Sequence, residues 1–252
     1  MSKRKTILIT GATSGVGYET AVKLISEGHR VQVTGRSAEA LAKLAALGAD
    51  VIQMDLTDIG AADHLLREMI MPDVIIFSAG VAKFALAHET EDQQLEQMFS
   101  VNVMAPIQFT QRIAPLWMER GTGHLIYIGS QAGKVATPKA AVYAATKHAL
   151  IGYTDALRME LLQYGIDVSV IHPGPIDTAF LDKADDGGTY RKSVGKHLLT
   201  VEEVAEAVVK TVYKPKRQVD LPRVMGLTSK LHAIAPGFVE RVGKPFFMKK
   251  MQ

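Results

Sequence analysis

The first apolar run of the chain, Thr6-Ile-Leu-Ile-Thr10, leads directly into Gly11-Ala-Thr-Ser-Gly15-Val-Gly17. The apolar run predicts a buried strand, and the amphipathic pattern over 17–27 predicts a helix after it. The three glycines between them permit a tight turn and let a phosphate group approach the N–H groups of the helix N-terminus. Their spacing, G-x-x-x-G-x-G, differs from the more common G-x-G-x-x-G. In this strand–turn–helix context, we favour nucleotide binding over an ordinary glycine-rich connection.

The same alternation continues along the chain. Further short apolar runs predict strands buried on both faces at 31–34, 51–54, 74–77, 125–128 and 168–171. Amphipathic patterns predict helices at 38–47, 61–71, 93–120 and 141–164. Strands that alternate with helices through short connections predict an α/β fold, a doubly wound, Rossmann-like parallel sheet with helices on both faces. No linker interrupts the pattern, so we expect residues 1–252 to form a single domain.

Composition excludes several classes of protein. The chain is 47% hydrophobic and 22% charged, which is typical of a globular protein rather than a disordered or fibrous one. It has no Cys, which excludes disulfides, iron–sulfur clusters, thiolate zinc sites and cysteine nucleophiles. The net charge of +3 does not indicate a nucleic-acid partner, and the eight His show no metal-ligand spacing. No run is long enough for a transmembrane helix or a signal-peptide core, so we expect a cytoplasmic protein.

Two strand ends bear on the choice of nucleotide. Arg36 follows the second strand, where an acid would bind the ribose 2′-hydroxyl of NAD and an arginine accommodates the 2′-phosphate of NADP. No acidic residue lies between the end of this strand and Glu39. Arg36 therefore favours NADP(H), with Ser37 as a helper, and NAD(H) stays the alternative. Asp55 and Leu56 end the third strand. The Asp55 carboxylate can accept from the adenine amino group or cap the following segment, and the pattern does not decide between these.

A group with acid–base character follows the fifth strand. Tyr143 and Lys147 lie four residues apart in the predicted helix 141–164, so both project from one face. A nearby ammonium is expected to lower the tyrosine pKa from its usual ~10 and so suit it to proton transfer in carbonyl reduction. Ser130 lies just past the strand, at the sheet edge where ligands bind. Its hydroxyl can donate to a substrate oxygen or cap a turn.

In this order, the motifs Thr10–Gly17, Ser130, Tyr143-x-x-x-Lys147 and Pro173-Gly174 resemble the short-chain dehydrogenase/reductase (SDR) family over about residues 6–180. The resemblance implies that Tyr143 is the acid/base and that Ser130 holds the substrate oxygen. It implies that Lys147 binds the nicotinamide ribose and lowers the tyrosine pKa. Asn102 corresponds to a helix asparagine that holds a water linking Lys147 to solvent.

The resemblance also assigns the cofactor site. It comprises Gly11, Thr13, Ser14, Gly15, Val16, Gly17, Arg36, Ser37, Asp55, Leu56, Ser78, Ala79, Gly80, Tyr143, Lys147, Pro173, Gly174, Ile176 and Thr178. The segment 172–178 would orient the nicotinamide through backbone groups and a Thr hydroxyl. Two features depart from the family. Phe77-Ser-Ala-Gly80 replaces Asn-Asn-Ala-Gly, and the glycine-rich turn lacks a basic residue, so the NADP assignment rests on Arg36.

The substrate pocket is expected between the strand ends and the segment 180–199. That segment is polar and contains Gly187-Gly188, so it is either a hinged lid or a surface loop without a catalytic role. The side chains expected to line the pocket are Val81, Phe84, Gln131, Val135 and Phe180. No arginine cluster stands ready to clamp an anion, so we expect an apolar or mixed carbonyl/alcohol substrate.

The C-terminal segment 214–252 differs from the rest. It carries nine basic residues against two acidic ones, a charge of +7, whereas residues 1–213 carry −4. Residues 219–222 could form the last strand of the sheet, and a helix is expected around 227–235. The extension resembles the SDR branch that contains hydroxysteroid dehydrogenase-like and related bacterial oxidoreductases. It either packs on the body or a partner subunit, or contacts an anionic membrane.

The resulting expectation is an oxidoreductase that transfers hydride between NADP(H) and a carbonyl/alcohol pair. Two alternatives stay open, a dinucleotide-binding sensor or scaffold without turnover, and a membrane-peripheral reductase of lipid carbonyls. The joint presence of Asn102, Ser130, Tyr143 and Lys147 argues against the sensor. A homodimer built on the long helices 93–120 and 141–164 is expected, and the extension leaves the family's tetramer open.

Overall fold

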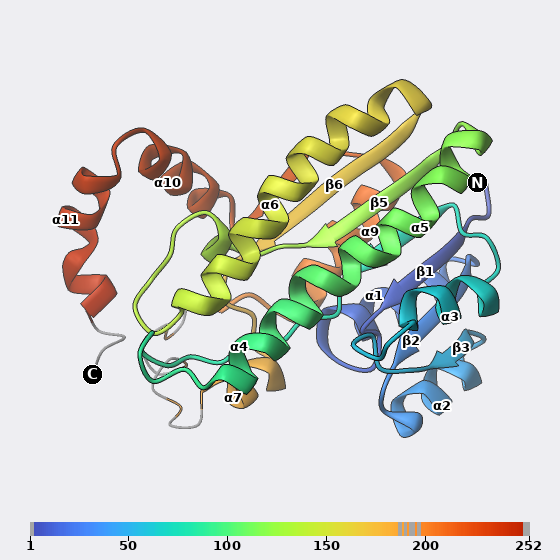
Figure 1. The fold of residues 1–252 in the computed structure, drawn as a ribbon, viewed down its shortest axis with the longest axis horizontal. Coiled ribbons are helices and arrows are strands. Elements are labelled where there is room, and N and C mark those ends of the chain that lie inside the picture. The colour runs from blue at the N-terminus through green and yellow to red at the C-terminus, as the bar shows by residue number, and fades with distance from the viewer. Residues whose placement is uncertain (1–2, 186–187, 189–190, 192–194, 196–197, 249–252) are drawn as a thin grey trace.

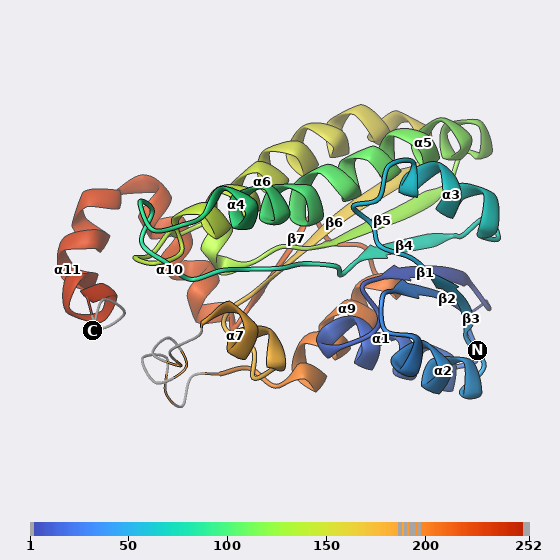
Figure 2. The same ribbon diagram turned by 60° about the horizontal axis from the view of Figure 1, so that its bottom comes forward.

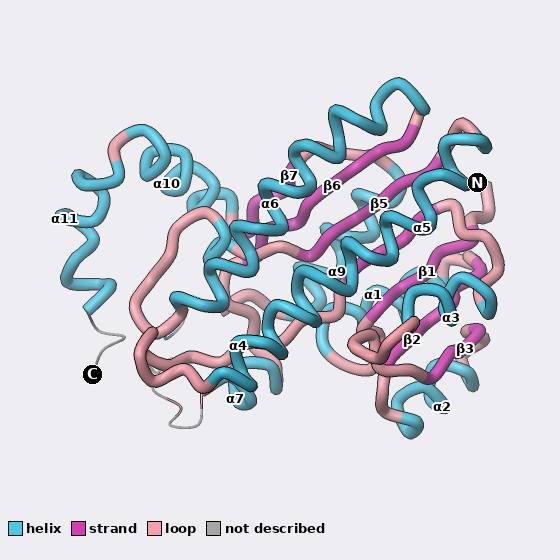
Figure 3. The backbone as a smooth tube through the Cα atoms, viewed as in Figure 1, coloured by secondary structure: helices cyan, strands magenta, loops and turns pink. Residues whose placement is uncertain are grey.

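The computed structural model contains one seven-stranded parallel sheet with the order β3-β2-β1-β4-β5-β6-β7 (Figures 1 and 3). The structure describes residues 3–185, 188, 191, 195 and 198–248. The strands are β1 (Thr6–Thr10), β2 (Arg30–Gly35), β3 (Asp50–Gln53), β4 (Val74–Phe77), β5 (Gly123–Ile128), β6 (Ile166–Pro173) and β7 (Gln218–Leu221). The strand order reverses between β1 and β4, which opens a crevice at their carboxyl ends. The predicted doubly wound fold is confirmed.

Helices cover both faces of the sheet (Figure 2). One face carries α1 (Gly15–Ser26), α2 (Ala38–Ala46) and α9 (Val201–Tyr213). The other carries α3 (Ala61–Glu68), α4 (Asp92–Phe99), α5 (Ala105–Arg120) and α6 (Ala141–Leu161). The remaining helices are α7 (Ala179–Ala184), α10 (Arg223–Ile234) and α11 (Pro236–Met248). None of the helices in the described ranges is long and apolar enough to cross a membrane.

The core consists of two apolar layers that share the central strands. Ile7 and Ile9 of β1 point into the layer under α1 and α9, and Leu8 points into the layer under α5 and α6, all fully buried. This alternation explains why central strands read as continuous apolar runs. The prediction that this strand, too, is buried on both faces is wrong for β3, where Val51 is 42% exposed. Because β3 lies at the sheet edge and pairs only with β2, its side chains are incompletely covered.

The predicted helix 93–120 is not continuous. A π-helical turn, Ser100–Met104, separates α4 from α5. Single π-turns within helices are frequent at functional sites. Here the turn contains Asn102, whose side chain is tied to segments outside the helix. Those distant bonds stabilise the turn, and Pro106, which has no N–H to donate to the preceding turn, follows it at the start of α5.

Near the C-terminus, the sequence prediction omits α9 and α11 and only suggests β7 and α10. α9 was not predicted, although it begins with a capping box in which Thr200 Oγ1 accepts from the Glu203 amide and Glu203 Oε2 accepts from the Thr200 amide. The suggested strand at 219–222 is confirmed as β7, which pairs with β6. The segment 214–252 is therefore not one extension, because its first part completes the sheet.

Candidate active site

The glycine-rich turn after β1 packs tightly against the segment after β4. Gly11 has φ +68°, and a Cβ atom there would lie 2.5 Å from the Ala79 Cα. A Cβ atom at Gly17 would lie 2.6 Å from the Gly11 carbonyl oxygen. Only glycine fits these two positions, because any larger residue would push the turn away from its neighbours.

The N-terminus of α1 faces the segment that follows β6. Gly15 opens α1 with φ +53°, and a Cβ atom there would lie 3.7 Å from Thr178 Cγ2. The first-turn N–H groups of a helix have no acceptor inside it, and the Ser14 side chain does not cap them. The free N–H groups and the positive end of the helix dipole lie at the N-terminus of α1, beside the close-packed glycine turn. This arrangement fits the negatively charged pyrophosphate of a dinucleotide.

Arg36 and Asp55 lie together at the ends of β2 and β3. Arg36 Nη1 is 3.4 Å from Asp55 Oδ2, and the arginine side chain is 66% exposed. Asp55 Oδ1 also accepts from the Thr57 amide and hydroxyl, at 2.9 and 2.8 Å. Burial alone would raise the pKa of Asp55. The hydrogen bonds from Thr57 and the charge of Arg36 lower the pKa by more than burial raises it, so it falls below the ordinary value. Asp55 thus caps the following turn, the second of the two roles considered from sequence.

Other residues assigned to the adenosine half also have local roles. Ser37 caps α2, because its Oγ accepts from the Ala40 amide at 3.3 Å. Thr13 packs on the end of β2, where its methyl group fills the space that a Cβ atom at Gly35 would need. A narrow cleft at the carboxyl ends of β1 and β4 is lined by Thr10, Leu56, Phe77, Ala79 and Val101, among others. Leu56 and Ala79 therefore face one cleft, as a shared cofactor site requires.

Ser130 and Tyr143 meet at the carboxyl end of β5. Ser130 Oγ accepts from the Ala132 amide at 3.1 Å, which caps a 3₁₀ turn, Gln131–Gly133. Tyr143, only 8% exposed on α6, lies near enough to Ser130 for the serine hydroxyl to affect its pKa. Burial raises the pKa of Tyr143 to about 12, and the Ser130 hydroxyl lowers it only partly. The predicted lowering of the tyrosine pKa is therefore wrong, because burial of the phenol raises its pKa by more than Ser130 lowers it.

Lys147 lies on the same face of α6 as Tyr143, as the spacing predicted. Its Nζ atom is 5.8 Å from the centre of the Tyr143 ring and donates to the Ile128 carbonyl at 3.0 Å. The side chain is 4% exposed, and burial lowers the pKa of Lys147 to about 8. A Cβ atom at Gly80 would lie 3.8 Å from Lys147 Nζ and 3.5 Å from Asn102 Oδ1. The glycine thus leaves room between the two side chains.

Asn102 joins the segment after β4 to α6. Its Oδ1 accepts from the Val81 amide at 2.9 Å, and its Nδ2 donates to the Val81 carbonyl at 2.8 Å. Nδ2 also donates to Thr146 Oγ1 at 3.1 Å. With the side chain buried, these bonds fix the backbone beside Gly80 relative to the helix that carries Tyr143. The structure therefore gives Asn102 a direct positioning role within the protein.

The segment after β6 is held against β7. Gly174 N–H donates to the Leu221 carbonyl at 2.6 Å, and Ile176 forms an isolated parallel bridge with Leu199. Pro173 and Gly174 are buried, and Ser78 and Thr178 are partly buried. The segment predicted to orient the nicotinamide therefore reaches from the sheet edge to the N-terminus of α1.

Two aromatic rings flank Tyr143. The centres of the Phe84 and Phe180 rings lie 6.0 and 6.1 Å from the centre of the Tyr143 ring. Beside them is a cavity of about 340 Å³, lined by Lys83, Phe84, Ala85, Glu89, Glu91, Gln94, Lys139 and Asp185. Of the residues predicted to line the pocket, Phe84 lines this cavity, whereas Val81, Val135 and Phe180 do not, and most of its other lining residues are charged.

The predicted lid is only partly described. Its first residues form the end of α7, and Gly188 has φ +61°. Gly187, the other half of the predicted hinge, lies outside the described residues. Gln131 does not line the pocket, contrary to the prediction. Its Nε2 instead donates to the His172 carbonyl at 2.9 Å and to Asp220 Oδ1 at 2.8 Å.

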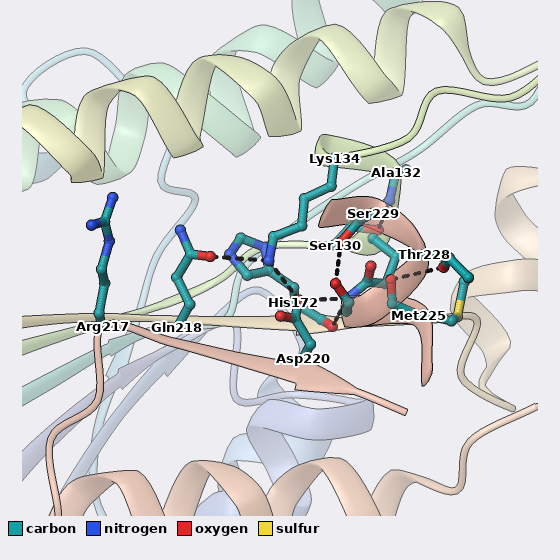
Figure 4. A network of polar contacts seen from close by, with 12 residues as sticks. Ser130, Ala132, Lys134, His172, Arg217, Gln218, Asp220, Met225, Thr228 and Ser229 are labelled. Atoms are coloured by element: carbon teal, nitrogen blue, oxygen red, sulfur yellow. Dashed lines mark hydrogen bonds and ion pairs between the residues drawn. The ribbon is translucent and has the colours of Figure 1, made fainter. Parts of the chain in front are cut away.

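A half-buried ion pair supports the turn after Ser130 (Figure 4). Lys134 Nζ lies 2.6 Å from Asp220 Oδ1 and 3.0 Å from Gln218 Oε1, and the two charged side chains are 14% and 17% exposed. Together with Gln131, this pair fastens the turn to β6 and β7. Sequence reasoning missed it because the partners lie 86 residues apart and no motif links them. Among the described residues, no group of three or more His, Asp or Glu side chains could hold a metal ion.

Comparison with known proteins agrees with this arrangement. A family model described as short chain dehydrogenase matches residues 5–187. The chain belongs to the short-chain dehydrogenase/reductase family. The oxidoreductase YbbO of Escherichia coli is 31% identical over 251 residues, which cover 94% of this chain and 92% of YbbO. Dehydrogenase/reductase SDR family member 7B of Bos taurus is 33% identical over 257 residues, which cover 94% of this chain and 79% of that protein.

A solved structure with the same fold also contains a cofactor. The closed form of serine dehydrogenase complexed with NADP⁺ superposes with a TM-score of 0.80 at 30% identity, covering 86% of this chain and 94% of that chain. The protein is therefore an NAD(P)-dependent dehydrogenase/reductase. The predicted family and enzyme class are confirmed, and the glycine-rich turn with the α1 N-terminus fits the dinucleotide.

Proposed function

We propose that this SDR enzyme interconverts a carbonyl compound and its alcohol with NADP(H), and that Tyr143 is the general acid/base. The observation that carries the proposal is the buried Tyr143 beside Lys147 on one face of α6, between the rings of Phe84 and Phe180 and close to Ser130. When bound, the nicotinamide supplies or accepts the hydride. The aromatic walls favour a substrate with an apolar part next to the reacting carbon.

The protein's own groups manage the proton. A substrate oxygen placed between Ser130 Oγ and the Tyr143 hydroxyl can accept a hydrogen bond from each. With its pKa raised to about 12, the phenol is protonated at neutral pH and ready to donate during carbonyl reduction. Lys147 is charged at neutral pH, and its ammonium favours the phenolate that remains after donation. Its bond to the Ile128 carbonyl holds it on the same side of α6 as the phenol.

A Tyr143→Phe variant tests this mechanism. It should bind NADPH with unchanged affinity and lose turnover by about a thousandfold, because only the transferable proton is removed. Tyr164→Phe, a change to a tyrosine that is 38% exposed beyond α6, is the control and should keep full activity. The assay is NADPH oxidation with a panel of apolar and mixed carbonyl compounds. Turnover that survives in Tyr143→Phe refutes the mechanism, and cofactor binding without turnover in the wild type supports the sensor alternative instead.

Arg36 supports NADP(H) as the preferred cofactor, with NAD(H) as the alternative. Its exposed guanidinium lies at the end of β2, where the adenosine ribose is expected, and the related serine dehydrogenase was solved with NADP⁺. Arg36→Ala should weaken NADPH binding about tenfold or more and leave NADH binding unchanged, since a charged hydrogen bond is lost. Arg30→Ala, on the same strand and paired with Asp50, is the control. An Arg36→Ala variant that keeps its NADPH preference refutes the assignment.

We also propose a homodimer that uses α5 and α6. Exposed apolar side chains on these helices support it, namely Met104 just before α5 (48%), Leu116 (37%), Met159 (73%) and Leu162 just after α6 (75%). Replacing Met159 and Leu162 together by Glu should place charge in the interface and halve the mass measured by light scattering. An unchanged dimer mass in that variant removes α6 from the interface.

A further inference from the structure

α10 and α11 form a helical hairpin that lies outside the sheet, at the end where the strands carry the active site (Figures 1 and 2). Four apolar side chains of α10 are exposed: Val224 (63%), Leu227 (70%), Leu231 (46%) and Ile234 (83%). Because they recur every three or four residues, they form one stripe along the helix. α11 continues the exposed apolar surface with Phe238 (62%), Val242 (65%) and Met248 (45%).

The opposite side of α10 is fixed to the body. Gly226 and Ser229 are buried, and a Cβ atom at Gly226 would lie 2.6 Å from the Asp220 Cβ. A Cβ atom at Gly174 would lie 2.9 Å from Met225 Sδ. Figure 4 shows this base of the hairpin beside the Lys134–Asp220 pair. The apolar stripe is therefore not the face with which α10 packs on its own domain.

The hairpin also carries four of the nine basic residues that the sequence places in 214–252. Its exposed basic residues are Arg223, Lys230, Arg241 and Lys244, against one acid, Glu240, which lies 3.6 Å from His232. On the helical wheel of α10, Arg223 and Lys230 border the apolar stripe. The remaining basic residues of the described part of 214–252 precede β7, where Arg217 pairs with Asp155. Apolar and cationic side chains thus gather on the hairpin alone.

We propose that the α10–α11 hairpin docks the enzyme on an anionic lipid surface. An exposed apolar stripe bordered by cations is the arrangement of helices that lie in a membrane interface. A second copy fits this surface less well, because a pair of hairpins would bring eight cations together, four from each copy. The docked enzyme presents the end of the sheet that carries the active site toward the lipid. The proposal goes beyond the catalytic function and does not depend on it.

Vesicle co-sedimentation of the full chain tests the docking. Wild-type protein should bind vesicles of phosphatidylcholine with phosphatidylglycerol at 50 mM salt, and bind at least tenfold less to phosphatidylcholine alone or at 0.5 M salt. Leu227→Gln with Ile234→Gln should reduce binding at least tenfold. Arg223→Gln with Lys230→Gln should reduce it by a comparable factor, since each surface cation contributes about fivefold. Leu47→Gln with Ile59→Gln, at side chains 49% and 107% exposed far from the hairpin, is the control and should bind like the wild type.

Three results overturn the docking proposal. They are no binding by the wild type, equal binding to neutral and anionic vesicles, and equal losses in the hairpin and control variants. A hairpin variant that halves the mass in solution without changing vesicle binding assigns the surface to a second copy instead. Binding is measured without cofactor or substrate, so its failure leaves the catalytic proposal untouched. Unchanged turnover of a water-soluble carbonyl by the hairpin variants shows that they are folded.

Discussion

Two lysines near the site, the buried Lys147 and the half-buried Lys134, have opposite environments, so replacing each by methionine should change stability in opposite directions. Lys147 is 4% exposed, and burial lowers its pKa to about 8. Its ammonium has the neutral Ile128 carbonyl as acceptor. Lys134 instead contacts the Asp220 carboxylate at 2.6 Å. Methionine at position 147 therefore removes a buried charge that destabilises the folded state. Methionine at position 134 leaves the Asp220 carboxylate without its cationic partner.

The magnitudes follow from these environments. A pKa that falls from 10.5 to about 8 means that the charged Lys147 costs the folded state about 3 kcal/mol at pH 7, at roughly 1.4 kcal/mol per pH unit. Lys147→Met removes this cost and loses about 1 kcal/mol with the bond to Ile128, which leaves a net stabilisation of about 2 kcal/mol. Lys134→Met should destabilise the protein by about 3 kcal/mol, because the half-buried Asp220 keeps its charge without its partner.

The pH dependence of stability distinguishes the loss of a buried charge in Lys147→Met from a change in side-chain packing, which would not depend on pH. Between pH 8 and 10.5, the unfolded chain binds a proton at Lys147 that the folded protein does not, so wild-type stability rises with pH in this window. The advantage of Lys147→Met should therefore shrink above pH 8. Tyr143→Phe is the matched control in the same site. The folded pKa of Tyr143, about 12, lies above its ordinary value of 10, so its contribution is lost only above pH 10.

Urea denaturation of the wild type and the three variants at pH 7, 8 and 9 measures these differences. We expect Lys147→Met to have the highest midpoint at pH 7 and to lose turnover, which would show that a catalytic ammonium is retained against stability. Tyr143→Phe should differ from the wild type by an amount that does not change between pH 7 and 9. A Lys147→Met variant that is less stable than the wild type at pH 7, or whose difference is constant with pH, refutes the reasoning.

Three further predictions concern the supporting structure. Gly15→Ala, at φ +53°, should lower the free energy of unfolding by about 1 kcal/mol and weaken NADPH binding in a fluorescence titration. Gly28→Ala, at φ +84° in open space, is the control and should lower stability alone. Equal NADPH affinities of the two variants speak against phosphate binding at the glycine-rich turn. Burial lowers the His124 pKa to about 4, so stability falls as pH drops from 6.5 toward 4, and His124→Gln should flatten this acid limb in urea midpoints. Asn102→Ala loses three hydrogen bonds and should lower the unfolding free energy by about 2–3 kcal/mol; an unchanged midpoint contradicts its positioning role.

The features that sequence predicted well depend on local geometry. The four-residue step from Tyr143 to Lys147 fixes a common helix face whatever surrounds it. The glycines at 11 and 15 were predicted in a turn, and both have the positive φ that glycine permits. α9 could also have been predicted, since Thr200 and Glu203 form a capping box just before an apolar pattern.

The features that sequence missed depend on distant contacts or on burial. The π-turn at Asn102 is stabilised by bonds to Val81 and Thr146, which are 21 and 44 residues away. The pKa of Tyr143 was predicted in the wrong direction because spacing shows that an ammonium is near but not that the phenol is buried. Burial depends on the whole assembled core, so no window of sequence contains it.

The C-terminal segment shows how charge can divide a chain differently from structure. By net charge, the C-terminal segment begins at Lys214. In the structure, the part outside the sheet begins only after β7, because β7 completes the sheet. The Asp220 carboxylate of β7 accepts from Gln131 and Lys134, and so supports the turn that begins at Ser130. Its Cβ also meets the backbone of α10 at Gly226. This half-buried carboxylate therefore supports both the turn that begins at Ser130 and the base of the exposed hairpin. The surface proposed to meet lipid is thus attached to the same part of the structure that supports the serine proposed to hold the substrate oxygen.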